Sequence, residues 1–216
     1  MSAPDVLRWG VAACALGAAT ALVVQAYGTR SFGLRPPQAA PSASAWRGLA
    51  YAFGAGMSPA AKESTRSHPF VYALGVSYHL GIFTALATLL WVVIAGPDRV
   101  APIAVVRAII IMLTAAGTVG GVALLVRRAR TPLLRSISVP DDYVANSLTT
   151  AFIALAALQL LVARLESAFL VVAMFLLAYA PLGKIRHCLF FFIARGHLGR
   201  HYGRRGTFPL RHGRGD

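Results

Sequence analysis

Five stretches of the sequence are apolar over about twenty residues or more. A helix needs about 20 apolar residues to cross a hydrocarbon layer roughly 30 Å thick. Within lipid, only helices and closed barrels satisfy every backbone N–H and C=O group. The sequence therefore predicts an all-α integral membrane bundle of five transmembrane helices, which together form a single membrane domain over residues 1–216. The predicted spans cover residues 9–27, 70–95, 101–126, 143–163 and 167–192.

Proline and glycine mark the interruptions of this pattern. Gly96 and Pro97 predict the end of the second span. Pro181 and Gly183 fall inside the fifth stretch, and a proline within a membrane helix usually kinks it. The only long connection, residues 28–67, reads as a loop with a short interfacial helix around residues 46–54.

The first apolar stretch has a second interpretation as a signal peptide. Arg8 precedes it, and the segment Val24-Gln25-Ala26 loosely fits a small-residue cleavage site. The two interpretations differ in whether four or five spans stay in the mature chain.

Composition excludes several classes of protein. Hydrophobic residues make up 57% of the chain, too many for a disordered segment, and two cysteines are too few for a disulfide scaffold. The 21 Lys and Arg against 7 Asp and Glu would suit a nucleic-acid-binding domain. A soluble domain of that kind could not expose so much apolar surface, so we expect no nucleic-acid partner.

The basic residues predict the orientation of the chain. With five spans, residues 28–67, residues 127–142 and the C-terminal end share one side of the membrane, and seventeen of the 21 Lys and Arg residues belong to them. Cytoplasmic loops carry an excess of Lys and Arg. We therefore expect the N-terminus outside, the C-terminus in the cytoplasm, and residues 195–216 as a basic cytoplasmic tail.

Two histidines are predicted at membrane depth. His79 lies about 16 Å into the second span when counted from His68, and His187 about 12 Å above the cytoplasmic end of the fifth span. Because these spans run antiparallel, both imidazoles reach a similar depth. Such a pair suits the axial ligands of a b-type haem, and small residues flank His79 and would leave room for the macrocycle: Gly75, Ser77 and Gly81. Alternatively, His79 hydrogen-bonds a neighbouring helix and His187 reaches the interface.

A second pair, His68 and His197, is geometrically conceivable. His68 and His79 are close to three turns apart and share a helix face. However, Gly196 and Gly199 predict the end of the last helix, which would place this second site at or beyond the membrane interface.

Five segments share a pattern with known membrane cytochromes: SHPF at 67–70, YHLGIF at 78–83, RRARTPLLRS at 127–136, PDDY at 140–143 and APLGKIRH at 180–187. They resemble the family of the gamma subunit of respiratory nitrate reductase. The family includes the cytochrome b subunits of dissimilatory sulfite reductase and heterodisulfide reductase membrane complexes. Its five-span topology with the N-terminus outside also agrees with the charge pattern.

The resemblance implies one haem rather than two. In the two-haem members, helices two and five each supply two histidines, and His79 and His187 match the pair nearer the cytoplasm. The positions that would match the other pair fall near Leu89 and Phe169, where no histidine occurs. The resemblance thus implies one haem b with His79 and His187 bound to its iron.

The cations near the C-terminus have two interpretations each. Lys184 and Arg186 flank His187, where they would bind haem propionates or a quinone, or simply extend to the interface. The tail from Arg195 to Arg214 would dock a cytoplasmic or membrane iron–sulfur or molybdenum subunit, or lie on anionic membrane lipid.

Taken together, these features predict a b-type cytochrome that anchors a respiratory redox complex in a bacterial or archaeal cytoplasmic membrane. It would pass electrons between the quinone pool and a partner subunit of an oxidoreductase, and we expect no independent substrate chemistry. The alternative is a haem-free basic membrane scaffold or small transporter subunit, in which both histidines are structural or belong to a proton path.

Overall fold

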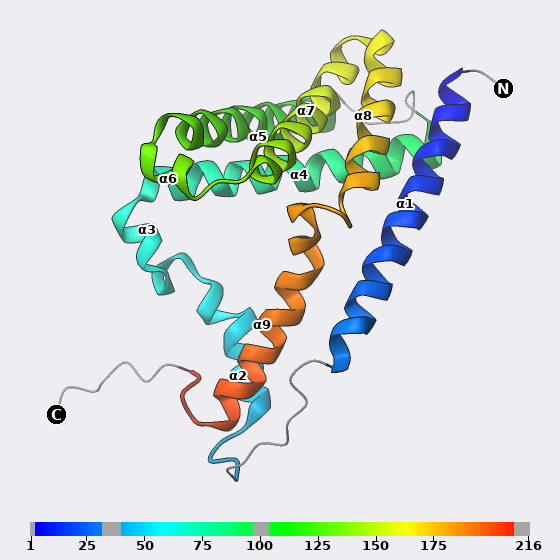
Figure 1. Cartoon of the computed structure of the whole chain (residues 1–216). Helices are drawn as coiled ribbons and strands as arrows, with labels where there is room; N and C mark the ends of the chain where they lie inside the picture. The colour runs from blue at the N-terminus through cyan, green and yellow to red at the C-terminus, as the bar shows by residue number, and fades with distance from the viewer. Residues whose placement is uncertain (1–2, 32–39, 97–103, 210–216) are drawn as a thin grey trace. The chain divides into compact units, whose positions relative to one another are not determined.

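The structure is a computed structural model, and it describes residues 3–31, 40–96 and 104–209. These residues form helices joined by turns and short 3₁₀ segments, and none of them lies in a strand. The α-helices are α1 (Ala3–Gly28), α2 (Ala45–Phe53), α3 (Glu63–Ser67), α4 (Pro69–Ala95), α5 (Ala104–Arg130), α6 (Pro132–Ser136), α7 (Pro140–Leu161), α8 (Glu166–Tyr179) and α9 (His187–Arg204) (Figure 1).

Four of these helices are long and apolar enough to cross a membrane. They are α1, α4, α5 and α7, and a fifth candidate arises if α8 and α9 together count as one broken span. The chain is thus an all-helical, multi-pass membrane protein with four to five candidate spans. Gly96, with a φ of +83°, follows the end of α4 as predicted, whereas Pro97 lies outside the described residues. The side of the membrane on which each terminus lies stays a prediction.

The fifth apolar stretch is not the continuous helix that the sequence predicts. α8 ends at Tyr179, a 3₁₀ turn follows over Lys184–Arg186, and α9 begins at His187. Pro181 has no N–H to donate to the preceding turn. Gly183 lies so close to the ring of Tyr179 that an added Cβ would be 2.2 Å from its Cζ. The helix therefore breaks where Pro181 predicts only a kink.

Contacts divide the chain into two compact units. The first unit contains Met1–Ala21 and Phe70–Ile185, and the second contains Leu22–Pro69 and Arg186–Asp216. The single membrane domain over residues 1–216 stays a prediction.

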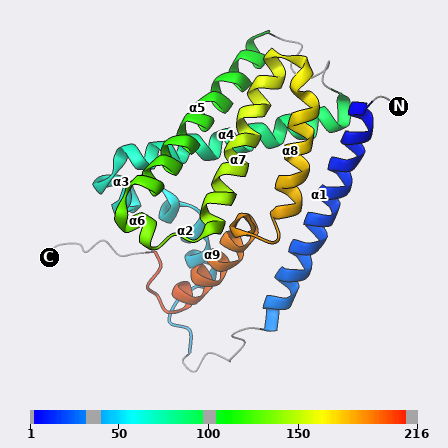
Figure 2. The same ribbon diagram turned by 45° about the horizontal axis from the view of Figure 1, so that its top comes forward.

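In the first unit, α7 lies between α5 and α8, and α4 crosses this layer (Figure 2). A core of buried side chains joins four helices, and at its centre the rings of Phe152 and Phe169 stack with centroids 5.3 Å apart. The core residues are Val11 of α1, Ala85, Leu89 and Val92 of α4, Phe152, Ile153 and Ala156 of α7, and Phe169, Leu170, Ala173 and Leu176 of α8.

Glycines set the close contact between α4 and α5. An added Cβ on Gly117 would lie 2.7 Å from the Cα of Gly81, and one on Gly120 would lie 2.8 Å from the carbonyl oxygen of Leu74. Small residues let two membrane helices approach until their backbones touch, which strengthens van der Waals packing. The α4–α5 contact is therefore a backbone-to-backbone one.

Arginines hold helix ends in the first unit. The Arg8 guanidinium lies 2.9 Å from a carboxylate oxygen of Glu166, the first residue of α8, and both side chains are largely buried. Arg107 of α5 donates a hydrogen bond to the carbonyl oxygen of Leu160 at the end of α7. The last carbonyls of a helix have no partner within it, so a cation there satisfies them.

The second unit is built on a pairing of α2 with α9, which lie side by side in both views (Figures 1 and 2). An added Cβ on Gly48 would lie 2.3 Å from the Cα of Gly203, and one on Gly199 would lie 2.9 Å from the Cβ of Ala52. The helix predicted around residues 46–54 is therefore present, and it packs through glycines.

The end of α9 lies later in the chain than predicted. The helix continues through Gly196 and Gly199 to Arg204, and Gly206 follows with a φ of +70°. A glycine in this left-handed conformation commonly terminates a helix. Gly199 instead provides the close contact with α2, so its lack of a side chain serves packing and not termination.

Arg195 belongs to the fold of this unit and not to a free tail. Its guanidinium donates hydrogen bonds to the carbonyl oxygen of Ala52 and, at 2.9 Å, to that of Gly56. These carbonyls lie at and just beyond the end of α2, where backbone acceptors lack helical partners. Residues 195–204, the first ten of the predicted tail, belong to α9 and are helical.

We predict that Gly203→Ala loosens the α2–α9 pair. The new Cβ would lie 2.8 Å from the Cα of Gly48, and backbone cannot yield as a flexible side chain does. We expect a loss of about 1–3 kcal/mol, typical of overpacking, measured as faster amide exchange in residues 45–53. Gly196→Ala on the same helix meets no atom within 4 Å and is the matched control. Equal exchange in both variants would show that the glycine contact does not hold the pair.

We also predict that Glu166→Gln destabilises the first unit. Arg8 would lose the charge of its nearer partner and keep only Asp5, 3.4 Å away, while its side chain stays largely buried. We expect about 1–3 kcal/mol, less than for a fully buried pair, measured by thermal unfolding in detergent. Glu63→Gln makes the same chemical change at an exposed position and should leave the unfolding temperature unchanged. An unaltered Glu166→Gln protein would mean that the ion pair contributes nothing to stability.

Candidate functional site

His79 lies in the first half of α4 with an exposed side chain and one fixed ring nitrogen. Its Nδ1 is 2.7 Å from the carbonyl oxygen of Gly75, one turn earlier. A carbonyl oxygen only accepts, so Nδ1 carries the proton and donates it to this bond. The lone pair then resides on Nε2, the nitrogen that points outward and can bind a metal.

Only one of the three small residues near His79 leaves space beside it. An added Cβ on Gly75 would meet nothing within 4 Å. Gly81 and Ser77, in contrast, face α5, where a Cβ on Gly117 would lie 2.7 Å from the Cα of Gly81 and 3.2 Å from the carbonyl oxygen of Ser77. The prediction that all three make room for a macrocycle is therefore wrong for Ser77 and Gly81, because helix packing uses them.

Tyr78, the neighbour of His79, binds α7 on another side of α4. Its hydroxyl donates to the carbonyl oxygen of Asn146, 3.2 Å away on α7, and accepts a bond from the Thr150 hydroxyl at 3.4 Å. Successive residues of a helix point about 100° apart. With Tyr78 bound to α7, His79 therefore points away from the α4–α7 contact.

His187 occupies a different local setting from the one predicted. It is the first residue of α9, exposed, and follows the 3₁₀ turn over Lys184–Arg186. The sequence predicts it within an unbroken helix, about 12 Å from its cytoplasmic end. His79 belongs to the first unit and His187 to the second. Their pairing across one haem stays a prediction.

His68 and His197 both belong to the second unit. His68 is the residue between α3 and α4, and His197 is exposed on α9. Over residues 40–96 and 104–209 no hydrogen bond or ring contact joins the two. A second haem between them also stays a prediction.

Lys184 lies in a cluster of charges at the start of α7. Its Nζ is 2.7 Å from a carboxylate oxygen of Asp142, and the guanidinium of Arg128 is 3.5 Å from the same oxygen. The other oxygen of Asp142 accepts the backbone N–H of Val139 at 3.0 Å. Arg186, the second predicted contact of a propionate or quinone, is exposed in the second unit.

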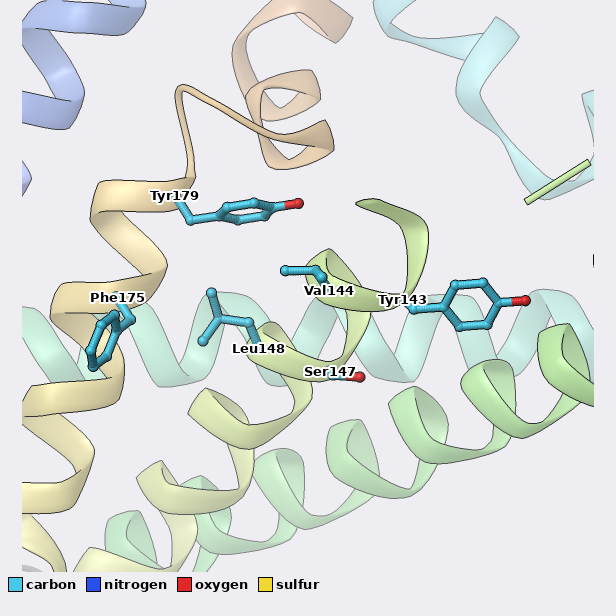
Figure 3. A pocket seen from close by; sticks show the side chains of 6 residues that line it. All are labelled: Tyr143, Val144, Ser147, Leu148, Phe175 and Tyr179. Carbon is cyan, nitrogen blue, oxygen red and sulfur yellow. The ribbon is translucent and has the colours of Figure 1, made fainter. Parts of the chain in front are cut away.

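An open groove of about 650 Å³ lies between α7 and α8 (Figure 3). Tyr179 points from α8 toward α7, and its hydroxyl is 3.5 Å from the carbonyl oxygen of Asp141. The Tyr179 end of the groove therefore lies near the start of α7, where Asp142 of the charge cluster follows Asp141. Its lining is mainly apolar, with three hydroxyl groups: Tyr143, Val144, Ser147, Leu148, Phe175 and Tyr179.

The sequence does not predict Asp142 or the groove as parts of a site. Asp142 follows Val139 and Pro140 at the spacing of a helix start, and this pattern signals its bond to the Val139 N–H. Nothing in the local pattern signals Lys184, which comes more than forty residues later. The groove requires the packing of α7 on α8, which the sequence leaves open.

No family model matches the chain, and no curated protein or solved structure matches it either.

We predict that Asp142→Asn weakens the start of α7. The change removes the charge that pairs with Lys184 and Arg128 and weakens the acceptor of the Val139 N–H. We expect a loss of about 1–2 kcal/mol, the sum of a helix-cap term and two partly exposed ion pairs, measured by thermal unfolding in detergent. Asp141→Asn removes the same charge one residue earlier and is the control. If both variants unfold at the same temperature, the cluster does not stabilise this end of the unit.

Proposed function

We propose that the protein is a b-type cytochrome subunit of a respiratory redox complex in a bacterial or archaeal cytoplasmic membrane. It would carry one haem b with His79 and His187 as axial ligands and exchange electrons between the quinone pool and a partner redox subunit. When bound, the haem would supply one-electron transfer, and the partner, an iron–sulfur or molybdenum protein, would perform any substrate chemistry.

The observation that carries the proposal is the geometry of His79. Its Nδ1–H is held by the Gly75 carbonyl, which fixes the tautomer and the ring orientation and leaves Nε2 as a donor to iron. The space beside Gly75 lies on the same helix face, one turn away. An exposed imidazole at membrane depth is costly unless it has a function. These residues fit one axial ligand position.

His187 and its neighbours complete the proposed ligand set. The resemblance of residues 180–187 to the end of the fifth helix in the nitrate reductase gamma family assigns His187 to the second axial position. It is the first residue of α9, directly after the helix break, and it is exposed. Arg186 precedes it and would pair with a propionate carboxylate.

The groove between α7 and α8 is the place we assign to the quinone. Aromatic and aliphatic side chains line it, and hydroxyl groups of Tyr143, Ser147 and Tyr179 are within its lining. Lys184 and Asp142, which precedes Tyr143 in the chain, form an ion pair at the start of α7, outside this lining. Such a lining suits a flat ring with two carbonyl oxygens.

The proposal predicts that His79→Ala and His187→Ala each abolish haem binding. Either change removes one of two axial nitrogens, and a single remaining imidazole holds a b-type haem weakly. The measurement is the haem content per chain of purified protein, from a reduced-minus-oxidised spectrum. His201→Ala, an exposed histidine of α9 without an assigned role, is the control and should keep the wild-type content.

The stoichiometry separates the alternatives. One haem per wild-type chain, lost in both variants, agrees with the single pair. Two haems per chain would bring His68 and His197 back as ligands. A wild-type protein without haem, or haem content unchanged in both variants, would contradict the proposal and favour a haem-free scaffold or transporter subunit.

A further inference from the structure

The α2–α9 pair carries exposed aromatic side chains, with two arginines beside them on α9. Trp46 and Phe53 are seven residues apart on α2, so they lie on one face. The ring of Phe53 stacks on that of Phe192 of α9, with centroids 6.3 Å apart and planes at 11°. Arg200 and Arg204 lie eight and twelve residues after Phe192, about 80° and 120° further round α9, so they flank the side that carries Phe192. We name these five residues the aromatic–arginine face.

This face is not covered within the described part of the second unit. The exposed fractions are 73% for Trp46, 57% for Phe192 and 38% for Phe53. On α2 the contact glycine, Gly48, lies roughly opposite Trp46 and Phe53, whereas on α9 Phe192 shares its side with Gly199 and Gly203 and meets Phe53 there. Large apolar side chains that gather on an exposed surface mark a binding surface.

The charge of the pair indicates the kind of surface that it meets. Neither α2 nor α9 contains an Asp or Glu residue, and their cations are Arg47, Arg195, Arg200 and Arg204. Arg195 is occupied by the carbonyl oxygens of Ala52 and Gly56. Arg200 and Arg204 lie on the flank of α9 next to the side that carries Phe192. The binding partner must therefore combine apolar contact with negative charge.

We infer that the aromatic–arginine face binds the headgroup layer of a membrane that contains anionic phospholipid. Trp46, Phe53 and Phe192 enter the boundary between headgroups and acyl chains, where aromatic side chains concentrate. Arg200 and Arg204 contact the lipid phosphates. An interfacial helix with aromatic residues on one side and cations beside them has this composition. The inference is independent of haem binding.

A lipid surface suits this face better than a folded partner. The chain is a multi-pass membrane protein, so a bilayer surface is always near its connecting segments. The side chains are spread along two helices and do not line a pocket with a central anchor. Fluid lipid can pack around side chains arranged in this way. Contact with an acidic partner protein, or with another part of this chain, would instead shield Trp46 from lipid.

The test uses the full-length chain with Trp46 as its only tryptophan, in a Trp9→Phe, Trp91→Phe background. The protein is placed in nanodiscs of phosphatidylcholine alone or of an equal mixture with phosphatidylglycerol. Lipids brominated near the headgroup end of the acyl chain quench indole that reaches the interface, and acrylamide quenches indole in water. We expect strong bromolipid quenching and weak acrylamide quenching in the mixed discs, and the reverse in phosphatidylcholine alone.

Charge variants test the role of the arginines. Arg200→Gln with Arg204→Gln should lower the ratio of interface-bound to free Trp46 by about fivefold per arginine in the mixed discs. Arg130→Gln with Arg135→Gln removes the same charge from exposed positions of the first unit and should change nothing.

Three outcomes would overturn the inference. Acrylamide quenching without bromolipid quenching in both discs would show that the face is in water. Protection of Trp46 from both quenchers would show that protein covers it. Equal bromolipid quenching in both discs, unchanged in the Arg200 and Arg204 variant, would refute recognition of anionic lipid.

Discussion

The constraint on which the whole chain depends is that hydrocarbon accepts no unpaired backbone polar group. Helices satisfy this requirement within each segment, and four long apolar ones follow from it. Since lipid is as apolar as leucine, burial of side chains brings little stability between such helices. The first unit accordingly has a small core, and many large side chains stay exposed, among them Trp9, Ile94 and Phe175.

Glycine contacts and arginine bonds carry the packing that a larger core would otherwise supply. Gly81 meets Gly117 between α4 and α5, and Gly48 meets Gly203 between α2 and α9. Arginines satisfy acceptors at helix ends, as Arg107 does for α7 and Arg195 for α2. In both units the closest contact between helices uses glycines, and many large apolar side chains stay exposed.

The sequence predicts the apolar helices well because hydropathy and length fix them through local physics. It also predicts the helix around Trp46. Its errors concern residues whose role depends on a distant neighbour. Gly199 predicts the end of a helix, but in the structure it packs against Ala52. Gly183 lies directly against the ring of Tyr179. The predicted depth of His79 marks it as a candidate ligand. The ion pair between Lys184 and Asp142, in contrast, joins two segments that no local sequence pattern relates.

The central claim is that His79 and His187 bind opposite faces of one haem iron. A low-temperature electron paramagnetic resonance spectrum of the oxidised wild-type protein tests it most directly, because it reports the ligands of ferric haem. Our account predicts a single low-spin ferric species with two imidazole ligands, lost together with the haem in His187→Ala. A high-spin spectrum of the wild-type protein, or a low-spin signal that persists in His187→Ala, would contradict it.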